Sequence, residues 1–244
     1  MPRFFIDAQP TNDVAVISGG DAHHVYSVLR MRPGEKLTCC DFFSNEYACE
    51  IAEASDERIV LSVLGVKPAA SEPPFPVTLL MALPKGDKME WIIQKAVELG
   101  VTAIRPFSSK YTVVKLDEKT AEKKVERWRK IAKSAAEQSG RGRVPEVLPP
   151  VSFASAVRDC ENSPALKIIC YEGETQTSLK TLLSENQRPD GIVFAVGAEG
   201  GFDRSEVDEA KKYGFRAVTL GKRILRCETA PLAVLAQFSY VFEL

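Results

Sequence analysis

Residues 77–100, which read VTLLMALPKGDKMEWIIQKAVELG, decide the fold class of this 244-residue chain. The segment opens with an unbroken apolar run, Val77 to Leu83, which is typical of a strand buried on both faces of a parallel sheet. The apolar residues that follow recur at helical spacing, namely Met89, Ile92, Ile93, Ala96 and Val97. Gly100 comes next and favours the end of a helix. The segment therefore predicts one strand followed directly by one helix.

The same alternation continues to the carboxyl terminus. Further apolar runs predict strands at 102–107, 166–171, 192–197 and 216–220. Between and after them, amphipathic patterns predict helices near 118–139, 178–186, 205–213 and 229–242. Strands that alternate with helices are the signature of an α/β fold with a mainly parallel sheet and helices on both faces.

The first 65 residues follow a different pattern. Short apolar runs at 37–40, 47–52 and 59–66 predict strands, and 21–31 predicts one short helix capped by Asp21. Four prolines follow between residues 67 and 76, where neither a helix nor a central strand accommodates them. We therefore expect a small β-rich domain over 1–66, a linker over 67–76 and the α/β domain over 77–244.

The composition narrows the class of protein. The chain is 45% hydrophobic and 27% charged with a net charge of −1, which is typical of a globular protein. It has no apolar stretch of about 18 residues that would cross a membrane. Six scattered cysteines without a Cys-x-x-Cys pair, and only two histidines, argue against a structural metal site. The first residues show no export pattern, so we expect a cytoplasmic protein with reduced thiols, no metal and no membrane partner.

A glycine-rich loop, VGAEGGF at 196–202, follows the strongest predicted strand. Ligands of α/β sheets bind beyond the carboxyl ends of strands, and glycines allow the backbone to approach them closely. The spacing matches neither the dinucleotide fingerprint nor the P-loop. A tight strand-to-helix turn without a ligand is an equally good interpretation of the glycines alone.

A second loop, LGKRILRCETAP at 220–231, also follows an apolar strand and ends where a helix begins. Thr229 suits the N-cap of that helix and Pro231 its first turn. Three cations and one glutamate between two core elements are unusual for a connecting loop. The alternative interpretation is a solvated basic loop next to a capped helix.

The stretch from Arg105 to Arg143 contains twelve Lys or Arg residues against five Asp or Glu. Basic surfaces of this density attract phosphate backbones, and Arg3, Arg30 and Arg32 of the β-rich domain would extend one. Taken alone, however, a run of charges is more often only the solvated face of a helix.

Four motifs in the same order resemble one known family. GAEGGF at 197–202 and LGKRILRCETAP at 220–231 resemble signature loops of the SPOUT-class RNA methyltransferases. The segments ALPKGDKMEWIIQKAVELGV at 82–101 and AAEQSGRGRVPEV at 135–147 resemble signatures of the family that methylates N3 of a uridine in bacterial 16S ribosomal RNA. The chain departs from that family at Ala198 and Lys222, where proline is usual, and at Cys227, where threonine is usual.

The resemblance implies an N-terminal PUA-like β-barrel, a C-terminal SPOUT domain tied in a trefoil knot, and a homodimer. It implies S-adenosylmethionine as the cofactor and 16S ribosomal RNA, in the small ribosomal subunit, as the partner. The expected cofactor-binding residues are Tyr171, Gly197, Glu199, Gly200, Gly201, Leu220, Gly221, Ile224, Leu225, Thr229 and Ala230. The expected RNA-binding residues are Arg3, Arg30, Arg32, Lys85, Arg141 and Arg143.

The chemistry of N3 methylation indicates the catalytic residues. The N3 proton must leave before the nitrogen attacks, so the site needs a general base or a cation that stabilises the uridine anion. Arg226 is the expected cation, and Glu199 or Glu228 is the expected base.

Two other functions fit parts of the sequence. A non-catalytic RNA-binding protein would use the β-rich domain and the basic helix, but would leave the paired loops unexplained. A nucleotide-dependent α/β enzyme would hold a phosphate in the glycine loop, yet the P-loop lysine and the acidic ribose partner are missing.

Overall fold

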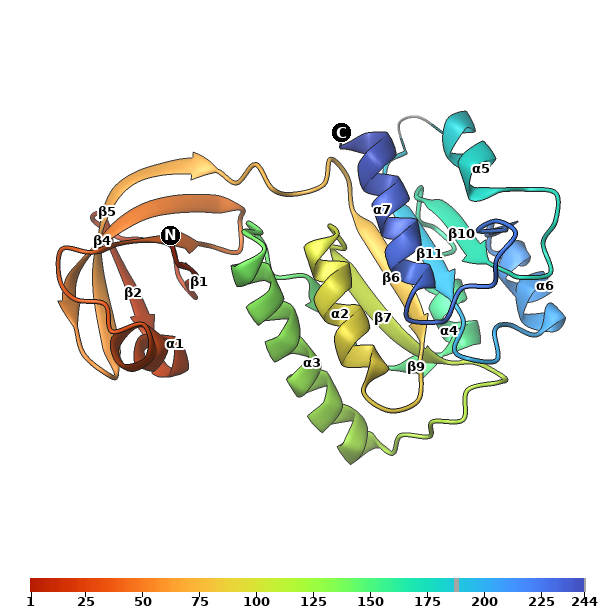
Figure 1. Cartoon of the computed structure of the whole chain (residues 1–244), viewed down its shortest axis with the longest axis horizontal. Helices are drawn as coiled ribbons and strands as arrows, with labels where there is room; N and C mark the ends of the chain where they lie inside the picture. The colour runs from red at the N-terminus through yellow and green to blue at the C-terminus, as the bar shows by residue number, and fades with distance from the viewer. Residues whose placement is uncertain (187–188, 244) are drawn as a thin grey trace. The chain divides into compact units, whose positions relative to one another are not determined.

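The computed structural model describes residues 1–186 and 189–243, and the chain divides into two compact units (Figure 1). The first unit comprises Met1–Glu72 and Ala136–Val144, and the second comprises Pro73–Ala135 and Pro145–Leu244. The segment 136–144 thus leaves the α/β sequence to join the β-rich unit, an arrangement that no local pattern predicts.

A curled five-stranded sheet, an open half-barrel, forms the first unit in the order β1-β3-β4-β5-β2 (Figure 1). Its strands are β1 (Arg3–Phe5), β2 (Val14–Ser18), β3 (Lys36–Cys40), β4 (Asn45–Ala54) and β5 (Arg58–Pro68). Strands β3, β4 and β5 confirm the predicted runs, and β5 continues to Pro68, inside the stretch expected to be linker. The edge strands β1 and β2 were not predicted, and β1 has only three residues, too few for a clear alternating pattern.

The predicted helix at 21–31 was wrong in its bounds and its cap. Helix α1 (Gly19–His23) continues into a π-helical turn (His24–Val28), and Ser18 stands at the N-cap position without a side-chain bond. Asp21 lies inside the helix. Gly19 has a φ of +61°, which a glycine adopts without strain and which sets the sharp entry into this helix.

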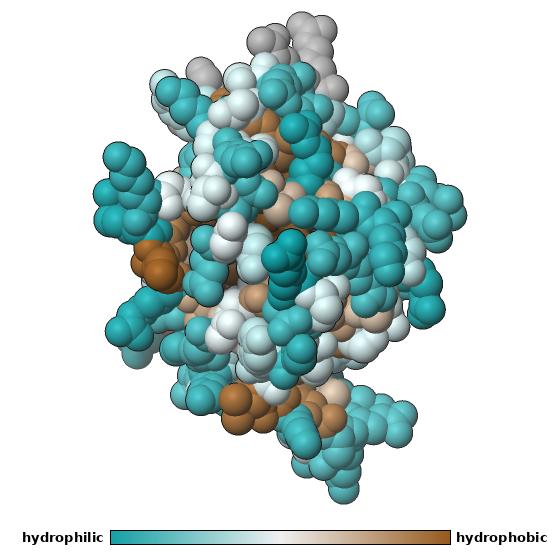
Figure 2. All heavy atoms as spheres, turned by 90° about the vertical axis from the view of Figure 1, so that its right-hand side faces the viewer, coloured by the Kyte–Doolittle hydropathy of each residue, from teal (hydrophilic) through white to brown (hydrophobic). Residues whose placement is uncertain are grey.

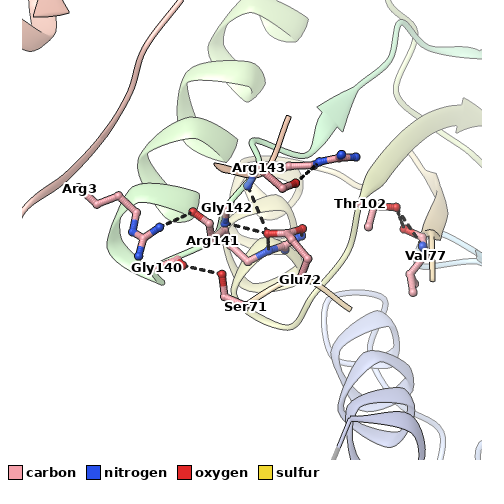
Figure 3. Close-up of polar contacts among 10 residues, drawn as sticks. Arg3, Ser71, Glu72, Val77, Thr102, Gly140, Arg141, Gly142 and Arg143 are labelled. Carbon is pink, nitrogen blue, oxygen red and sulfur yellow. Dashed lines mark hydrogen bonds and ion pairs between the residues drawn. The ribbon is translucent and has the colours of Figure 1, made fainter. Parts of the chain in front are cut away.

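The segment 139–143 is built into the first unit by one buried arginine. Arg141 is only 3% exposed, and its Nε and Nη2 lie 2.9 and 2.7 Å from the two carboxylate oxygens of Glu72 (Figure 3). The backbone N–H groups of Gly142 and Arg143 donate to the same carboxylate at 2.8 and 3.2 Å. The guanidinium of Arg141 is therefore buried against a carboxylate, which argues against the predicted contact with RNA, and that contact stays a prediction.

The second unit is a seven-stranded sheet in which every pairing is parallel, ordered β12-β10-β11-β6-β7-β8 with β9 also paired to β7. Its strands are β6 (Val77–Ala82), β7 (Ala103–Ser108), β8 (Glu146–Val147), β9 (Val151–Ser152), β10 (Leu166–Cys170), β11 (Ile192–Val196) and β12 (Arg216–Val218). Its helices are α2 (Lys88–Glu98), α3 (Glu118–Gln138, whose last turn belongs to the first unit), α4 (Phe153–Arg158), α5 (Leu179–Glu185), α6 (Arg204–Lys212) and α7 (Ala230–Phe242). The predicted α/β fold with a parallel sheet is confirmed, while β8, β9 and α4 were too short to be predicted.

Helices cover both faces of this sheet (Figure 1). On one face, Phe107, Phe153 and Phe202 pack together with the buried side of α6, with ring centroids 5.2 to 6.0 Å apart. On the other face, Phe194 of β11 meets Phe238 of α7 edge to face at 5.4 Å. The sheet is therefore buried on both sides, as its continuous apolar strands require.

Helix α7 differs in detail from its prediction. Thr229 stands at the N-cap position but makes no side-chain capping bond, and Pro231 lies in the first turn as expected. Leu235 and Phe238 of this helix are buried within this chain. Exposed apolar groups on this helix come instead from Tyr240 and Val241.

Candidate functional site

One cavity of about 380 Å³ lies in the second unit at the carboxyl ends of four parallel strands. Its walls come from the start of α2 after β6 and from the residues that follow β10, β11 and β12. A volume of this size suits a cofactor-sized ligand, and the carboxyl edge of a parallel sheet is where α/β folds bind ligands.

The glycine loop after β11 owes its shape to contacts of its own backbone. The N–H of Gly201 donates to the carbonyl of Ala198 at 3.0 Å, and Gly201 has a φ of +65°. A Cβ on Gly197 would lie 2.8 Å from the backbone of Gly201, so no side chain fits there. These constraints fold residues 197–201 into a tight turn with one side open to the cavity.

The outer side of this loop is held by the segment after β7. A Cβ on Gly200 would lie 2.7 Å from Cβ of Tyr111, and the hydroxyl of Tyr111 donates to Asp203 at 2.7 Å. Asp203 also caps α6 in a capping box with Glu206. The glycine loop is thus fixed from outside, and the role of Gly200 is to admit Tyr111.

The loop after β12 supplies the opposite wall. Gly221 has a φ of +115°, and no atom lies within 4 Å of the position of a Cβ there, so this glycine supplies conformation and open space. Arg226 anchors the start of α7 through its carbonyl, which accepts from the N–H of Thr229 and Ala230 at 2.9 Å. Its guanidinium is exposed and has no ion-pair partner among residues 1–186 and 189–243.

The ammonium of Lys88 joins the two loops. Its Nζ lies 2.8 Å from Oε1 of Glu199 and 3.5 Å from Oε2 of Glu228. The Sγ of Cys227, 4.0 Å from the same ammonium, donates to Glu228 at 3.2 Å. Two carboxylates, one ammonium and one thiol therefore lie together at one end of the cavity.

These contacts set the protonation states. Burial raises the pKa of Glu199, but the bonds from Lys88 and from the N–H of Lys85 outweigh it, so this pKa is lowered. The pKa of Glu228 is also lowered, because bonds from Cys227 and the charge of Lys88 outweigh burial. Burial and the bond to Glu228 raise the pKa of Cys227 to about 12. At neutral pH the site thus holds two carboxylates, an ammonium and a neutral thiol.

The structure brings most of the predicted site residues together. Arg226, Glu199 and Glu228 all line the cavity. The expected cofactor residues that line it are Tyr171, Gly197, Glu199, Gly201, Leu220, Gly221, Ile224, Leu225 and Ala230. Gly200 and Thr229 do not line it.

The expected RNA-binding residues lie in different settings. Arg30 and Arg143 are exposed, whereas Arg3 is largely covered and pairs with Glu46 at 2.7 Å. Arg32 is exposed, with its guanidinium 4.7 Å from the ring centroid of Tyr26. Lys85 is exposed close to Glu199, to which its backbone N–H donates.

Sequence reasoning missed Lys88, Glu172 and the thiol of Cys227 as parts of the site. Lys88 lies at the start of a predicted helix, where a lysine is normally interpreted as a solvent-exposed charge without a functional role. The available signal was its position just after the first strand of the sheet, at the edge where the two loops meet.

Figure 2 shows a mostly hydrophilic face, with hydrophobic residues in small groups. None of the helices in the described part of the chain is long and apolar enough to span a membrane. No cluster of three metal-ligating side chains occurs among the described residues.

Known proteins share this architecture over the whole chain. A model of the RNA methyltransferase domain matches residues 71–239, and one of the RNA methyltransferase PUA domain matches 17–64. Ribosomal RNA small subunit methyltransferase E of Bacillus subtilis is 37% identical over 100% of this chain and 98% of its own length. The protein of that name from Synechocystis sp. is 35% identical over 99% of this chain and 76% of its own.

A solved structure extends the match to the fold. The crystal structure of ribosomal RNA small subunit methyltransferase E from Neisseria gonorrhoeae, bound to S-adenosyl methionine, superimposes with a TM-score of 0.87. It is 36% identical and covers 99% of this chain and 98% of that one. With the two loops at the carboxyl edge of the sheet and a matching domain on each side of residue 71, this chain belongs to the RNA methyltransferase family that includes ribosomal RNA small subunit methyltransferase E.

Proposed function

We propose that this protein transfers a methyl group from S-adenosylmethionine to N3 of a uridine in 16S ribosomal RNA of the small subunit. The observation that carries the proposal is the cavity between the loops after β11 and β12, in a chain whose relatives act on small-subunit ribosomal RNA. The proposal includes action in the cytoplasm, a homodimer and the knotted path that the sequence resemblance implies.

The cavity fits S-adenosylmethionine in size and in chemistry. Its glycines expose backbone groups to a ligand, and Glu172, Glu199 and Glu228 give the cavity carboxylates that suit a cationic ligand. When bound, the cofactor supplies a methyl group that is already activated as a sulfonium. Calorimetric titration of the purified protein with S-adenosylmethionine tests this part of the proposal.

The remaining chemistry belongs to residues of this chain. Glu199 and Glu228 have lowered pKa values, so each is a weak proton acceptor. Arg226 carries an exposed, permanently charged guanidinium, which suits the uracil oxygen on which negative charge develops as N3 loses its proton. We therefore assign the main catalytic effect to anion stabilisation by Arg226, with Glu199 or Glu228 accepting the proton.

Mass spectrometry of ribosomal RNA nucleosides tests the reaction itself. A strain without this gene should lack 3-methyluridine in its 16S RNA, and the gene in trans should restore it. If a different modified nucleoside disappears and 3-methyluridine remains, methylation at N3 is contradicted. If the nucleoside profile is unchanged, the methyltransferase activity on 16S RNA is contradicted.

A further inference from the structure

Two consecutive phenylalanines, Phe42 and Phe43, stand on the turn between β3 and β4 of the first unit. They are 57% and 68% exposed. Large aromatic side chains in water forgo the free energy that burial would give them, and neighbouring exposed apolar groups often mark a contact site. The methyl-transfer site in the second unit makes no use of them.

The turn that carries these phenylalanines is held by a buried carboxylate. Asp41 accepts hydrogen bonds from the N–H of Phe43 at 2.8 Å and of Asn45 at 2.9 Å. It also accepts from the Asn45 side chain at 2.8 Å, the Tyr47 hydroxyl at 2.9 Å and Gln9 at 3.1 Å. Because the backbone of this turn is already fixed, a ligand that binds the two rings loses little conformational entropy in ordering the turn.

A second set of contacts fixes the far side of the turn. The carbonyl of Ser44, whose φ is +63°, accepts from the N–H of Ala69 at 2.8 Å. Nε of Arg143 donates to the hydroxyl of Ser44. The backbone of Arg143 is in turn held by Glu72 (Figure 3), so the exposed guanidinium is stationed beside the phenylalanine turn.

The charges around the turn are arranged with cations outermost. Glu46 is 17% exposed and is covered by Arg3 at 2.7 Å and by Lys67 at 3.1 Å, whereas Lys67 itself is 71% exposed. Glu72 is likewise paired with buried Arg141. The accessible charge next to the two rings is therefore positive, which favours a polyanion over an apolar protein surface or an acyl chain.

We propose that Phe42 and Phe43 form a stacking platform for unpaired bases of the RNA substrate, with Arg143 contacting an adjacent phosphate. The inference rests on the proposed function for the identity of the RNA. Unpaired bases stack on exposed aromatic rings, and arginine binds phosphate through its planar fork. The same arrangement divides the work of the basic motif at 139–143, in which Arg141 builds the loop and Arg143 faces the ligand.

The test compares RNA affinities of full-length variants, using single-stranded oligouridylate and an adenine–uracil duplex of equal length over a range of salt. Replacing both phenylalanines by alanine should weaken oligouridylate binding by roughly ten- to a hundredfold, the usual loss when a stacked base loses its ring. The logarithmic salt slope should stay unchanged, and duplex affinity should fall much less. Phe42→Leu with Phe43→Leu keeps apolar surface without an aromatic ring and should show nearly the same loss.

One control pair and one further variant isolate the platform. Val28→Ala with Leu29→Ala removes exposed apolar groups elsewhere on the first unit and should leave RNA affinity unchanged. Arg143→Gln should reduce the salt slope by about one unit, the signature of one lost phosphate contact. Thermal melts should match the wild type for the phenylalanine variants, because the bonds to Asp41 use backbone groups and other side chains.

Wild-type oligouridylate affinity in the alanine pair, or in the leucine pair, would overturn the platform. A change in sedimentation with RNA affinity unaltered would overturn it too, since the turn would then contact a protein. If the wild-type protein fails to methylate 16S RNA while the phenylalanine variants lose oligouridylate affinity as expected, the proposed function is contradicted and the platform still stands.

Discussion

The ammonium of Lys88 lies 2.8 Å from Oε1 of Glu199, a residue 111 positions further along the chain. The same ammonium reaches Glu228, so a single cation at the start of α2 offsets two carboxylates from two loops. Without it, burial and mutual repulsion would raise the pKa of both carboxyl groups. Lys88 is therefore a positioning residue that keeps both carboxyl groups ionised.

Removing this ammonium should move the pH dependence of cofactor binding. In Lys88→Met, Glu199 and Glu228 should take up protons at a higher pH than in the wild type. The attraction of ionised carboxylates for a cationic ligand should then fail earlier as the pH is lowered. Calorimetry with S-adenosylmethionine over the acid range measures the shift, and Lys95→Met, on the same helix but paired with Glu98, should show none. If the affinity of Lys88→Met falls at the same acid pH as that of the wild type, Lys88 does not keep the two carboxyl groups ionised.

Gly197 gives a prediction about the glycine loop. Alanine there places a Cβ 2.8 Å from the backbone of Gly201, which cannot give way as a flexible side chain would. We expect Gly197→Ala to cost about 1–3 kcal/mol of unfolding free energy, as overpacking commonly does, and to weaken S-adenosylmethionine binding. Gly65→Ala, where nothing lies within 4 Å, should leave both unchanged. Denaturant unfolding and calorimetry on the same samples measure the two effects, and a Gly197→Ala protein with normal binding would contradict the assignment.

The sequence predicts the second unit well because its strands and helices are long and strongly periodic. The run at 192–196 and the helix at 118–138 were placed within one or two residues. The motifs likewise predicted which two loops form the cavity. Contacts between distant residues could not be predicted, since a pair such as Lys88 and Glu199 exists only after the sheet places two strand ends side by side.

The burial of Arg141 could not be predicted for the same reason, because it too depends on a contact between distant residues. Arg141 belongs to a basic motif and reads as a surface cation, and only the fold reveals that Glu72 lies opposite it. A buried guanidinium needs such a partner, so the charge that suggested RNA binding instead holds the loop together. Exposure cannot be inferred from residue type where the partner lies 69 residues away.

This buried pair leads to a prediction about acid stability. Burial raises the pKa of Glu72, but Arg141 and the backbone N–H groups outweigh it, so the folded pKa is lowered. A lowered carboxyl pKa contributes stability that is present above the unfolded value and is lost as the pH falls through the folded value. Glu72→Gln should remove that part of the acid dependence. It should also cost about 1–3 kcal/mol near neutral pH, because it takes away the carboxylate that the buried guanidinium of Arg141 contacts through two hydrogen bonds.

Urea unfolding of the full-length protein at several pH values measures both effects. Glu122→Gln changes an exposed glutamate on α3 and should reproduce the wild-type curve. Wild-type stability of Glu72→Gln at neutral pH would show that the pair contributes nothing to the fold.

The proposed homodimer is tested on the exposed end of α7. Tyr240 and Val241 are the large apolar groups that this helix leaves in solvent, and a charge among them would oppose burial in an interface. We expect Tyr240→Glu to shift the protein toward monomer in sedimentation velocity. Val28→Glu, at another exposed apolar position in the first unit, should not change the distribution. Identical sedimentation of all three proteins would exclude this end of α7 from the interface.

The last prediction concerns Arg226 and the chemical step. Its guanidinium lines the cavity and has no ion-pair partner in the described residues, while Glu228, the partner that would brace it, is engaged by Lys88. A cationic donor that meets developing negative charge in an active site commonly contributes about 100- to 1,000-fold in rate. Arg226→Ala should therefore lose turnover by that order in single-turnover assays at saturating S-adenosylmethionine, with cofactor affinity retained.

Arg223 offers the matched control for that experiment. It lies in the same loop, lines the same cavity and is also exposed, so Arg223→Ala removes the same charge from a neighbouring position. If general electrostatic attraction of RNA were the whole effect, both variants would raise the KM for RNA and leave the saturated rate intact. A loss of the saturated rate confined to Arg226→Ala places its guanidinium at the reacting uracil. Equal saturated rates in the two variants and the wild type would remove Arg226 from the chemical step.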